Sequence, residues 1–302
     1  MRSNRRRLGV ALVLDPPVAD EVQGLRRAVG DPGLARIPPH VTLVPPVNVR
    51  AAEVPAALRR LRQAAADQPG PLRLTFGRPT TFLPVNPVLY LTVGGDLERL
   101  RRLRDAVFAP PLERSLSWPW VPHLTLADGA PEARIEAAVT ALADYAVVAD
   151  VDRVVLLEEG PGRVWAPWAD AALGRPARVG TGGLVLELTA GRLLDPEIAE
   201  RLERPCRRPL SVVITARREG EAVAAGAVWA DRSGPHVGVW VGDGHRNQGI
   251  GSQVLAHLES AARRAGWDHP ALQAEGPAGF YRSVSRWSVP SGEARYSNGT
   301  DE

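Results

Sequence analysis

Two short segments of the chain place a histidine two residues before a threonine. They are Pro39-His40-Val41-Thr42-Leu43 and, further along, Pro122-His123-Leu124-Thr125-Leu126. In a β-strand, residues two apart point to the same face, so each histidine would share a face with its threonine while the residues between pack on the other side. Imidazole titrates near neutral pH and can give or take a proton, and a hydroxyl can donate to a phosphate oxygen.

The matched frames of the two segments predict an internal duplication. A duplicated fold with a two-fold axis would bring both pairs into one cleft. One neutral imidazole would then take a proton from water or a hydroxyl, while the other, protonated, gives one to a leaving ribose oxygen. This arrangement predicts phosphodiester chemistry that requires no metal. A purely structural role for each histidine is the alternative, and the matched repeat argues against it.

On these motifs, residues from about 7 to 173 resemble the 2H phosphoesterase superfamily, in particular its 2′-5′ RNA ligase-like and cyclic phosphodiesterase branch. The resemblance implies a duplicated bilobal fold in which His40 and His123 are the acid/base pair and Thr42 and Thr125 bind phosphate. It implies that the substrates are 2′-linked or 2′,3′-cyclic phosphates of small nucleotides or RNA ends. Ligation would be an ATP-independent reversal of cleavage.

A second signal is the glycine-rich turn Arg246-Asn247-Gln248-Gly249-Ile250-Gly251-Ser252, between the alternating strand Val237–Val241 and a helix expected over Ser252–Ala265. Unpaired amides at a helix start bind anions, and glycine lets a ligand approach the backbone. A dinucleotide-binding fingerprint fails because Asn247 stands where glycine is required, and a P-loop needs a lysine. A purely structural glycine turn is the alternative.

The turn fits the Arg/Gln-x-x-Gly-x-Gly/Ala signature, and residues from about 183 to 302 resemble the GNAT acetyltransferases. The resemblance implies that this turn holds the pyrophosphate of acetyl-CoA and that the backbone from Val239 to Val241 pairs with the pantetheine arm. It also implies that Tyr281 protonates the departing thiolate. The amine acceptor is not identified. No carboxylate lies on the strand, which leaves as candidate bases Asp231, His236 and Glu275.

The chain contains no lysine, so its 37 basic residues are all arginine. This excludes lysine-dependent chemistry, such as P-loop phosphate binding, PLP Schiff bases and covalent lysyl-nucleotide ligation. The net charge of +3 is divided almost evenly between the two halves, which favours compact phosphate ligands over long nucleic acids. Cys206 is the single cysteine, in keeping with a reducing, cytoplasmic location. No apolar stretch approaches the ~20 residues of a membrane span.

At 302 residues the chain exceeds one ordinary core, and we expect two domains. The boundary is expected within Gly174–Gly183, which separates a phosphoesterase domain (1–174) from an acetyltransferase domain (175–302). The second domain is expected to be mixed α/β with a mostly antiparallel sheet. The first is expected to be α+β, with strands at Leu8–Leu14, His40–Val44, Leu72–Phe76, Val88–Val93, His123–Leu126 and Val151–Glu158, and helices at Val18–Val29, Ala51–Ala66, Leu97–Val107 and Glu132–Tyr145.

The sequence therefore predicts a bifunctional enzyme: a metal-independent phosphodiesterase joined to an acetyl-CoA-dependent N-acetyltransferase. Two alternatives stay open. Either only the acetyltransferase is active, or the protein is a non-catalytic module that binds terminal phosphates and senses acetyl-CoA. The sequence does not indicate an oligomeric state.

Overall fold

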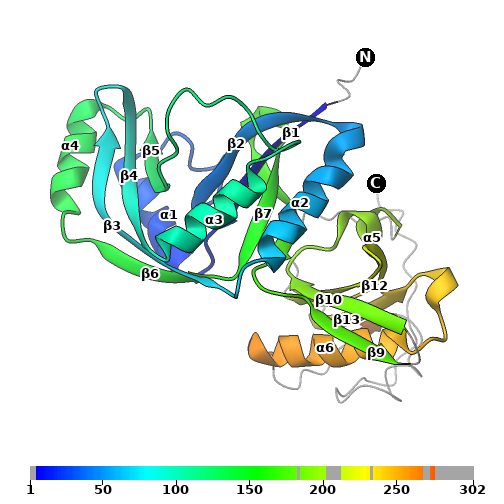
Figure 1. Cartoon of the computed structure of the whole chain (residues 1–302). Coiled ribbons are helices and arrows are strands. Elements are labelled where there is room, and N and C mark those ends of the chain that lie inside the picture. Colours follow the sequence, from blue (N-terminus) through cyan, green and yellow to red (C-terminus); the bar gives the residue numbers. More distant parts are fainter. Residues whose placement is uncertain (1–4, 182–183, 202–211, 232–233, 268–272, 276–302) are drawn as a thin grey trace. The chain divides into compact units, whose positions relative to one another are not determined.

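The computed structural model describes residues 5–181, 184–201, 212–231, 234–267 and 273–275 (Figure 1). The chain divides into two compact units, Met1–Arg175 and Pro176–Glu302. Each unit is built around its own sheet. Tyr281 and Cys206 lie outside the described residues.

The first unit contains an eight-stranded sheet in the order β6-β3-β4-β5-β2-β1-β7-β8. Its strand pairs are antiparallel. The two inner strands, β2 and β5, are bridged at one residue pair, Val41 with Leu124, so two four-stranded halves meet where the His-x-Thr segments lie. The strands are β1 (Arg5–Val13), β2 (His40–Arg50), β3 (Leu72–Phe82), β4 (Asn86–Gly95), β5 (His123–Asp128), β6 (Ala146–Val151), β7 (Arg153–Glu159) and β8 (Trp165–Ala172).

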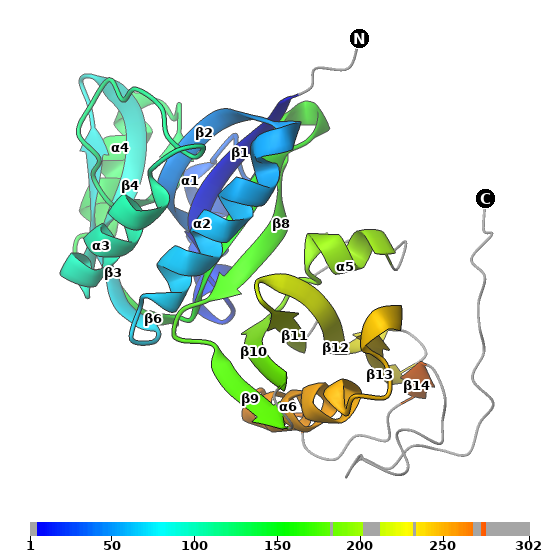
Figure 2. The ribbon, with the colours of Figure 1, turned by 45° about the vertical axis from the view of Figure 1, so that its right-hand side comes forward.

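Four helices cover this sheet, and equivalent helices occupy equivalent places in the two halves. They are α1 (Val18–Val29), α2 (Val54–Ala66), α3 (Leu97–Val107) and α4 (Glu132–Ala141). Helix α2 packs against β7 and β8 and touches α3, whereas α4 packs against β3 and β4 and touches α1 (Figures 1 and 2). Helix α1, which precedes β2, contacts β5, and α3, which precedes β5, contacts β2. Each half is therefore completed by a helix from the other.

As predicted, apolar and polar residues alternate along the inner strands, so each kind lies on its own face of the sheet. Val41 and Leu43 on β2, and Leu124 and Leu126 on β5, have no exposed surface. The histidines and threonines between them are partly exposed on the opposite face. Hydrophobic burial thus fixes the register of each strand, because a slip by one residue would bury the polar residues and expose the apolar ones.

The α+β class is confirmed, but three element predictions were wrong. Helix α4 ends at Ala141 and not at Tyr145, because a turn closed by the Tyr145 N–H and the Leu142 carbonyl (2.9 Å) follows it. The expected strand Val151–Glu158 corresponds to β7, which begins at Arg153, and the strand before it, β6, was not predicted and shares only Val151 with the expected range. Strand β8 was not predicted, since its mixed small and aromatic residues show neither strand nor helix periodicity.

The second unit contains a six-stranded sheet in the order β14-β13-β12-β11-β10-β9, which is antiparallel except that β14 runs parallel to β13. The mostly antiparallel sheet predicted here is confirmed. Strand β9 lies inside the segment expected to be a linker, and its pairing with β10 is a backbone property that its side chains do not reveal. The strands are β9 (Ala177–Thr181), β10 (Leu184–Gly191), β11 (Val212–Arg218), β12 (Glu221–Asp231), β13 (Gly234–Val241) and β14 (Gln273–Glu275).

Two helices lie on opposite faces of the second sheet, α5 (Pro196–Arg201) and α6 (Ile250–Arg264) (Figures 1 and 2). Val254 and Leu258 of α6 are fully buried in the larger core. A Cβ at Gly226 of β12 would lie 2.8 Å from the side chain of Val254, so this glycine lets α6 approach the sheet closely. The sheet and α6 together carry the glycine turn.

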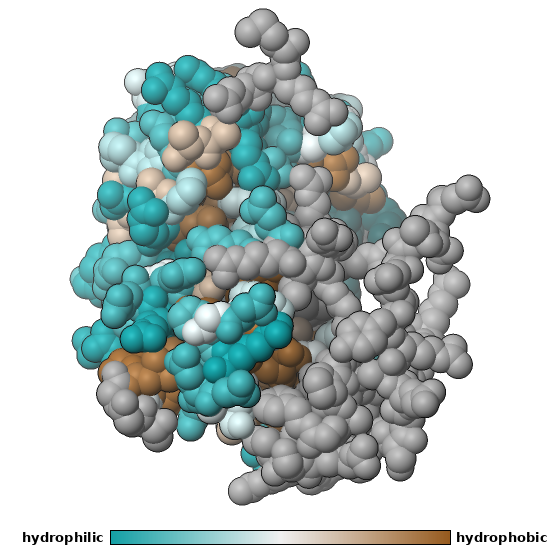
Figure 3. Space-filling view, turned by 90° about the vertical axis from the view of Figure 1, so that its right-hand side faces the viewer, coloured by the Kyte–Doolittle hydropathy of each residue, from teal (hydrophilic) through white to brown (hydrophobic). Residues whose placement is uncertain are grey.

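None of the described helices is long and apolar enough to cross a membrane. Among the coloured residues of Figure 3, hydrophilic ones predominate, and the hydrophobic ones form separate areas between them.

Candidate active sites

The two motif histidines are held by the same local contact. The Nδ1 atom of His40 lies 2.8 Å from the carbonyl oxygen of Pro38, and that of His123 lies 2.8 Å from the carbonyl oxygen of Val121. A carbonyl oxygen only accepts hydrogen bonds, so Nδ1 carries the hydrogen of each neutral ring and Nε2 is left as a proton acceptor. The turn before each strand thus fixes the tautomer of its histidine.

Burial lowers the pKa of both rings. Desolvation lowers the pKa of His40 to about 4; the hydrogen bond to Pro38 opposes this, and the positive charges of Arg26 and His123 add to it. Desolvation also lowers the pKa of His123, opposed by its hydrogen bond to Val121. The two rings therefore interact electrostatically, and burial favours the neutral form of each.

A pocket of ≈ 390 Å³ opens on the motif face of the sheet. His40, Thr42 and Thr125 line it, together with residues of β1, β7 and β8. His123 does not contribute to this lining. In the part of the chain that the structure describes, no group of three or more histidine, cysteine or carboxylate side chains is placed to hold a metal ion.

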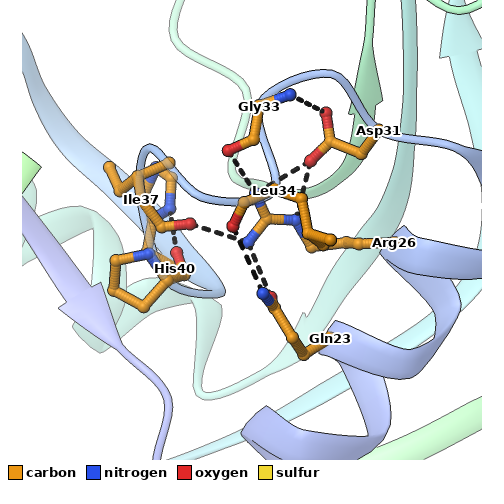
Figure 4. A network of polar contacts seen from close by, with 8 residues as sticks. Gln23, Arg26, Asp31, Gly33, Leu34, Ile37 and His40 are labelled. Atoms are coloured by element: carbon orange, nitrogen blue, oxygen red, sulfur yellow. Dashed lines mark hydrogen bonds and ion pairs between the residues drawn. The ribbon is translucent and has the colours of Figure 1, made fainter. Parts of the chain in front are cut away.

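A buried arginine, not singled out from the sequence, holds the turn that carries His40. Arg26 of α1 is 3% exposed and forms an ion pair of 2.8 Å with Asp31. Its guanidinium also donates to the carbonyl oxygens of Ile37 (2.8 Å) and Gly33 (3.3 Å), as Figure 4 shows. These bonds cross-link the end of α1 to the segment that leads into β2.

The sequence carries no signal that separates Arg26 from its neighbour Arg27. Basic residues are common in the last turn of a helix, where they interact favourably with the helix dipole. Arg26 is buried, whereas Arg27 is exposed, and only the fold of the following turn decides which of them points inward.

The surroundings of His123 are aromatic. Its ring lies edge-on to Phe82 (centroids 5.2 Å apart) and to Tyr90 (5.3 Å). The segment before β5 is tied to the neighbouring half, since the indole N–H of Trp120 donates to the carbonyl oxygen of Thr42 (2.9 Å). This bond holds the two motif strands side by side.

At its other end the pocket is bounded by Trp165, a residue for which the sequence suggested no role. The Trp165 ring packs against β1 at Gly9, where an added Cβ would lie 3.4 Å from the ring and 3.3 Å from the Val44 carbonyl oxygen. The backbone N–H of Trp165 donates to the carbonyl oxygen of Arg36 (2.7 Å), which joins the turn before His40 to the start of β8.

In the second unit, the predicted cofactor-binding residues lie on β13 and on the turn into α6. Val239 and Val241 are on β13 and are half-buried. The turn bends sharply, with left-handed backbone at Asn247 (φ 60°) and Gly249 (φ 75°). Helix α6 begins at Ile250 and not at Ser252 as predicted.

Helix α6 has no side-chain cap at its N-terminus. The amides of Ile250, Gly251 and Ser252 occupy its first turn, where backbone donors lack partners within the helix. Arg246 forms an ion pair of 2.8 Å with the exposed Asp243. An exposed pair of this kind is weak, so the guanidinium is available to an anion at little cost.

Of the candidate bases in this unit, His236 is buried and stacks on Trp229 with ring centroids 5.3 Å apart. Glu275 pairs with Gly238 in the parallel ladder between β13 and β14. Asp231 is the last residue of β12.

Two family models of known proteins match parts of the chain. Residues 14–163 match the family model of the 2′-5′ RNA ligase superfamily, and residues 209–284 match that of the acetyltransferase (GNAT) domain. The matched residues include both His-x-Thr segments and the glycine turn. The chain belongs to the 2′-5′ RNA ligase (2H phosphoesterase) superfamily and carries a GNAT acetyltransferase domain.

Curated relatives and a solved structure are similar to part of the chain. A Bacillus pumilus protein named "Putative phosphoesterase" is 34% identical over 122 residues, which are 39% of this chain and 68% of that protein. A Bacillus cereus protein of the same name is 28% identical over 171 residues, 56% of this chain and 98% of its own. The crystal structure of E. coli LigT complexed with 3′-AMP is 20% identical, covers 56% of this chain and 98% of its own, and gives a TM-score of 0.39.

Proposed function

We propose that the first unit hydrolyses 2′-linked or 2′,3′-cyclic phosphodiesters of small nucleotides or RNA ends with an acid/base pair of histidines and without a metal. The observation that carries this proposal is the matched Nδ1 contact of His40 and His123. It leaves both Nε2 atoms as proton carriers on neighbouring strands. The phosphoesterase domain is assigned to residues 1–174, as a duplicated bilobal fold, and the acetyltransferase domain to residues 175–302.

In this mechanism His40 is the base. The pKa of its ring, about 4, keeps Nε2 unprotonated at neutral pH, so it can take a proton from the attacking water. His123, protonated at Nε2, gives its proton to the ribose oxygen that leaves. One P–O bond to the water oxygen forms and one P–O bond to the ribose breaks, which leaves a phosphomonoester and a free hydroxyl.

The anionic substrate itself would favour the protonated form of the acid. A phosphate between the two rings raises the pKa of the nearby imidazoles, since an opposite charge stabilises their protonated form. The hydroxyls of Thr42 and Thr125 would donate to the non-bridging oxygens, where charge develops in the transition state.

The test is turnover of nucleoside 2′,3′-cyclic phosphates in the presence of EDTA. We expect hydrolysis to persist in EDTA and to be lost in His40→Ala and His123→Ala. Turnover that EDTA abolishes and added metal restores would contradict the metal-independent mechanism. Turnover that survives both substitutions would contradict the assignment of the two histidines.

For the second unit we propose acetyl-CoA binding at the start of α6 and transfer of the acetyl group to an amine. The uncapped first turn of α6, with Arg246 to Ser252 around it, offers amides and a guanidinium to the pyrophosphate. The backbone from Val239 to Val241 would pair with the pantetheine arm. Tyr281 stays the proposed acid for the thiolate.

Isothermal titration of the full chain with acetyl-CoA tests this site. Gly251→Asp places a carboxylate where the pyrophosphate would lie and should abolish the binding heat. Ala256→Asp adds the same charge at an exposed position further along α6 and should not. Equal binding by both variants, or none by the folded wild type, would contradict the assignment. Binding without turnover of any amine would favour the sensing module over the transferase.

A further inference from the structure

The pocket of the first unit extends well past the two His-x-Thr strands. Along β1 it runs from Ala11, which pairs with Thr42, to Gly9 and Arg7. Two residues of a β-strand span about 7 Å. The part of the pocket at Gly9 is therefore at least as far from Thr42, which would hold the reacting phosphate, as one phosphate of an RNA strand is from the next. Trp165 and Leu157 form an apolar floor over this interval, which suits a nucleoside.

The far end of the pocket is cationic. Arg7 at this end is neutralised by Glu159 at 2.6 Å, and Arg26, which lines the pocket on the His40 side, is neutralised by Asp31. Arg36 and Arg163 also line the pocket, and both are exposed.

Within the residues that the structure describes, neither Arg36 nor Arg163 has a hydrogen bond or an ion pair to its guanidinium. The two lie at the same end, because the Arg36 carbonyl binds the N–H of Trp165, two residues after Arg163. One lining carboxylate, Asp128, has no ion pair among the described residues either, but it is on β5, three residues beyond Thr125. Both arginines therefore belong to the Trp165 end of the pocket, whereas Thr42 and Thr125 line it at the motif strands.

We infer that Arg36 and Arg163 form a subsite for a second phosphate, so the preferred substrate is a nucleotide that carries a phosphate besides the one that reacts. This inference rests on the proposed phosphodiester chemistry at His40 and His123. A guanidinium presents a planar fork of donors that matches phosphate oxygens. An RNA end meets this requirement through its next phosphodiester, whereas a nucleoside cyclic phosphate does not.

Two substrates that differ by one phosphate give the sharpest test: adenosine 2′,3′-cyclic phosphate and the same compound phosphorylated at O5′. We expect the wild type to have a kcat/KM about tenfold higher for the 5′-phosphorylated substrate, since two solvent-exposed, charge-assisted contacts are added. The preference should shrink as ionic strength rises, because exposed charges are screened. Equal kcat/KM values for the two substrates would overturn the inference and leave the proposed hydrolysis intact.

The double variant Arg36→Gln/Arg163→Gln should lose the preference for the 5′-phosphorylated substrate. The matched control is Arg59→Gln/Arg101→Gln, which removes the same charge from exposed positions on α2 and α3 and should keep it. A preference that survives in the first variant, or disappears in the second, would contradict a specific subsite.

Binding distinguishes a failure of the subsite from a failure of the chemistry. Adenosine 3′,5′-bisphosphate and adenosine 3′-monophosphate differ only by the 5′-phosphate, and neither is a substrate for the proposed hydrolysis. Titration with each of them therefore measures what the second phosphate adds to the binding affinity. If neither cyclic substrate is hydrolysed, the proposed function fails, and the ratio of these two affinities still decides the inference. Tighter binding of the bisphosphate that depends on Arg36 and Arg163 supports the subsite, and equal affinities refute it.

Discussion

The ring of His40 lies near a buried ion pair, Arg26 with Asp31, whereas the ring of His123 lies against two aromatic rings, Phe82 and Tyr90. The strands, the turns and the Nδ1 contacts of the two histidines are alike. What differs is supplied by segments outside the repeated motif: α1 with the turn after it on one side, and β3 with β4 on the other.

The comparison shows how a repeated element acquires two roles. Burial opposes protonation of His40 and lowers its pKa, and the positive charge of Arg26 adds to this effect, which keeps the ring in the unprotonated form that a base requires. Near His123 there are aromatic faces and edges in place of a guanidinium, so a proton on this ring meets no comparable repulsion from Arg26. The repeat thus provides two imidazoles of the same tautomer, and the neighbours of His40 hold its ring in the unprotonated form at neutral pH.

The largest expected effect comes from removing each histidine in turn. His40→Ala and His123→Ala should each lower kcat for a cyclic phosphate by roughly 10²- to 10⁴-fold, the usual contribution of a general acid or base. A phosphodiester with a p-nitrophenyl leaving group separates the two roles, because p-nitrophenolate leaves without a proton. On this substrate His123→Ala should recover most of its activity and His40→Ala should not.

Two outcomes would break this assignment. If His40→Ala were the variant that recovers, the acid and the base would be exchanged. If both variants lost activity equally on both substrates, the two histidines would not have separate acid and base roles. The difference between their surroundings would then have no effect on catalysis.

The next effect concerns the buried ion pair on the His40 side. Asp31→Asn leaves the Arg26 charge buried without its carboxylate, which should reduce the free energy of unfolding by about 3–5 kcal/mol. The control Glu98→Gln breaks the exposed pair with Arg102, which should cost only about 0.3–0.5 kcal/mol. The unfolding of this unit in urea, monitored by hydrogen exchange in peptides from β1 and β2, measures the loss of unfolding free energy in each variant. Similar losses in both variants would mean that Asp31 is not a structural support for the His40 turn.

Much of the candidate site could be predicted from the sequence because its residues repeat. Alternation around His40 and His123 predicts which face each residue occupies, and the duplication predicts that the two strands come together. The glycine turn predicts a helix start, although the helix begins two residues earlier than expected. These features depend on a few residues close together in the chain.

The surroundings of the histidines could not be predicted, because they depend on contacts between distant segments. In the sequence, Arg26 looks like any other basic residue at the end of a helix. Trp165 is one of eight tryptophans, and nothing in the sequence distinguishes it from the others. Their roles arise from the turn after α1 and from the packing of an indole over Gly9. For the same reason β9 was expected to be part of a linker. Its arginine and glycine residues show no strand pattern, and the strand forms through backbone pairing with β10.

The smallest effect that we predict tests the aromatic side. The kcat/KM for a cyclic phosphate requires His40 unprotonated and His123 protonated. It should therefore fall on the acid side as pH drops through the His40 pKa of about 4, and on the basic side as pH rises through the His123 pKa, which burial holds below 6.5. Phe82→Leu removes a ring from beside His123 and admits water, which should raise the His123 pKa and move only the basic limb to higher pH.

The matched control for Phe82→Leu is Phe108→Leu, which shortens an aromatic residue that packs on Arg104 and not on His123. Its pH profile should coincide with that of the wild type. A shift of the acid limb in Phe82→Leu would show that the ring acts on both histidines together, since the two interact electrostatically. A basic limb that does not move would mean that the aromatic rings position His123 without setting its pKa, and the difference between the two histidines would then rest on the Arg26 side alone.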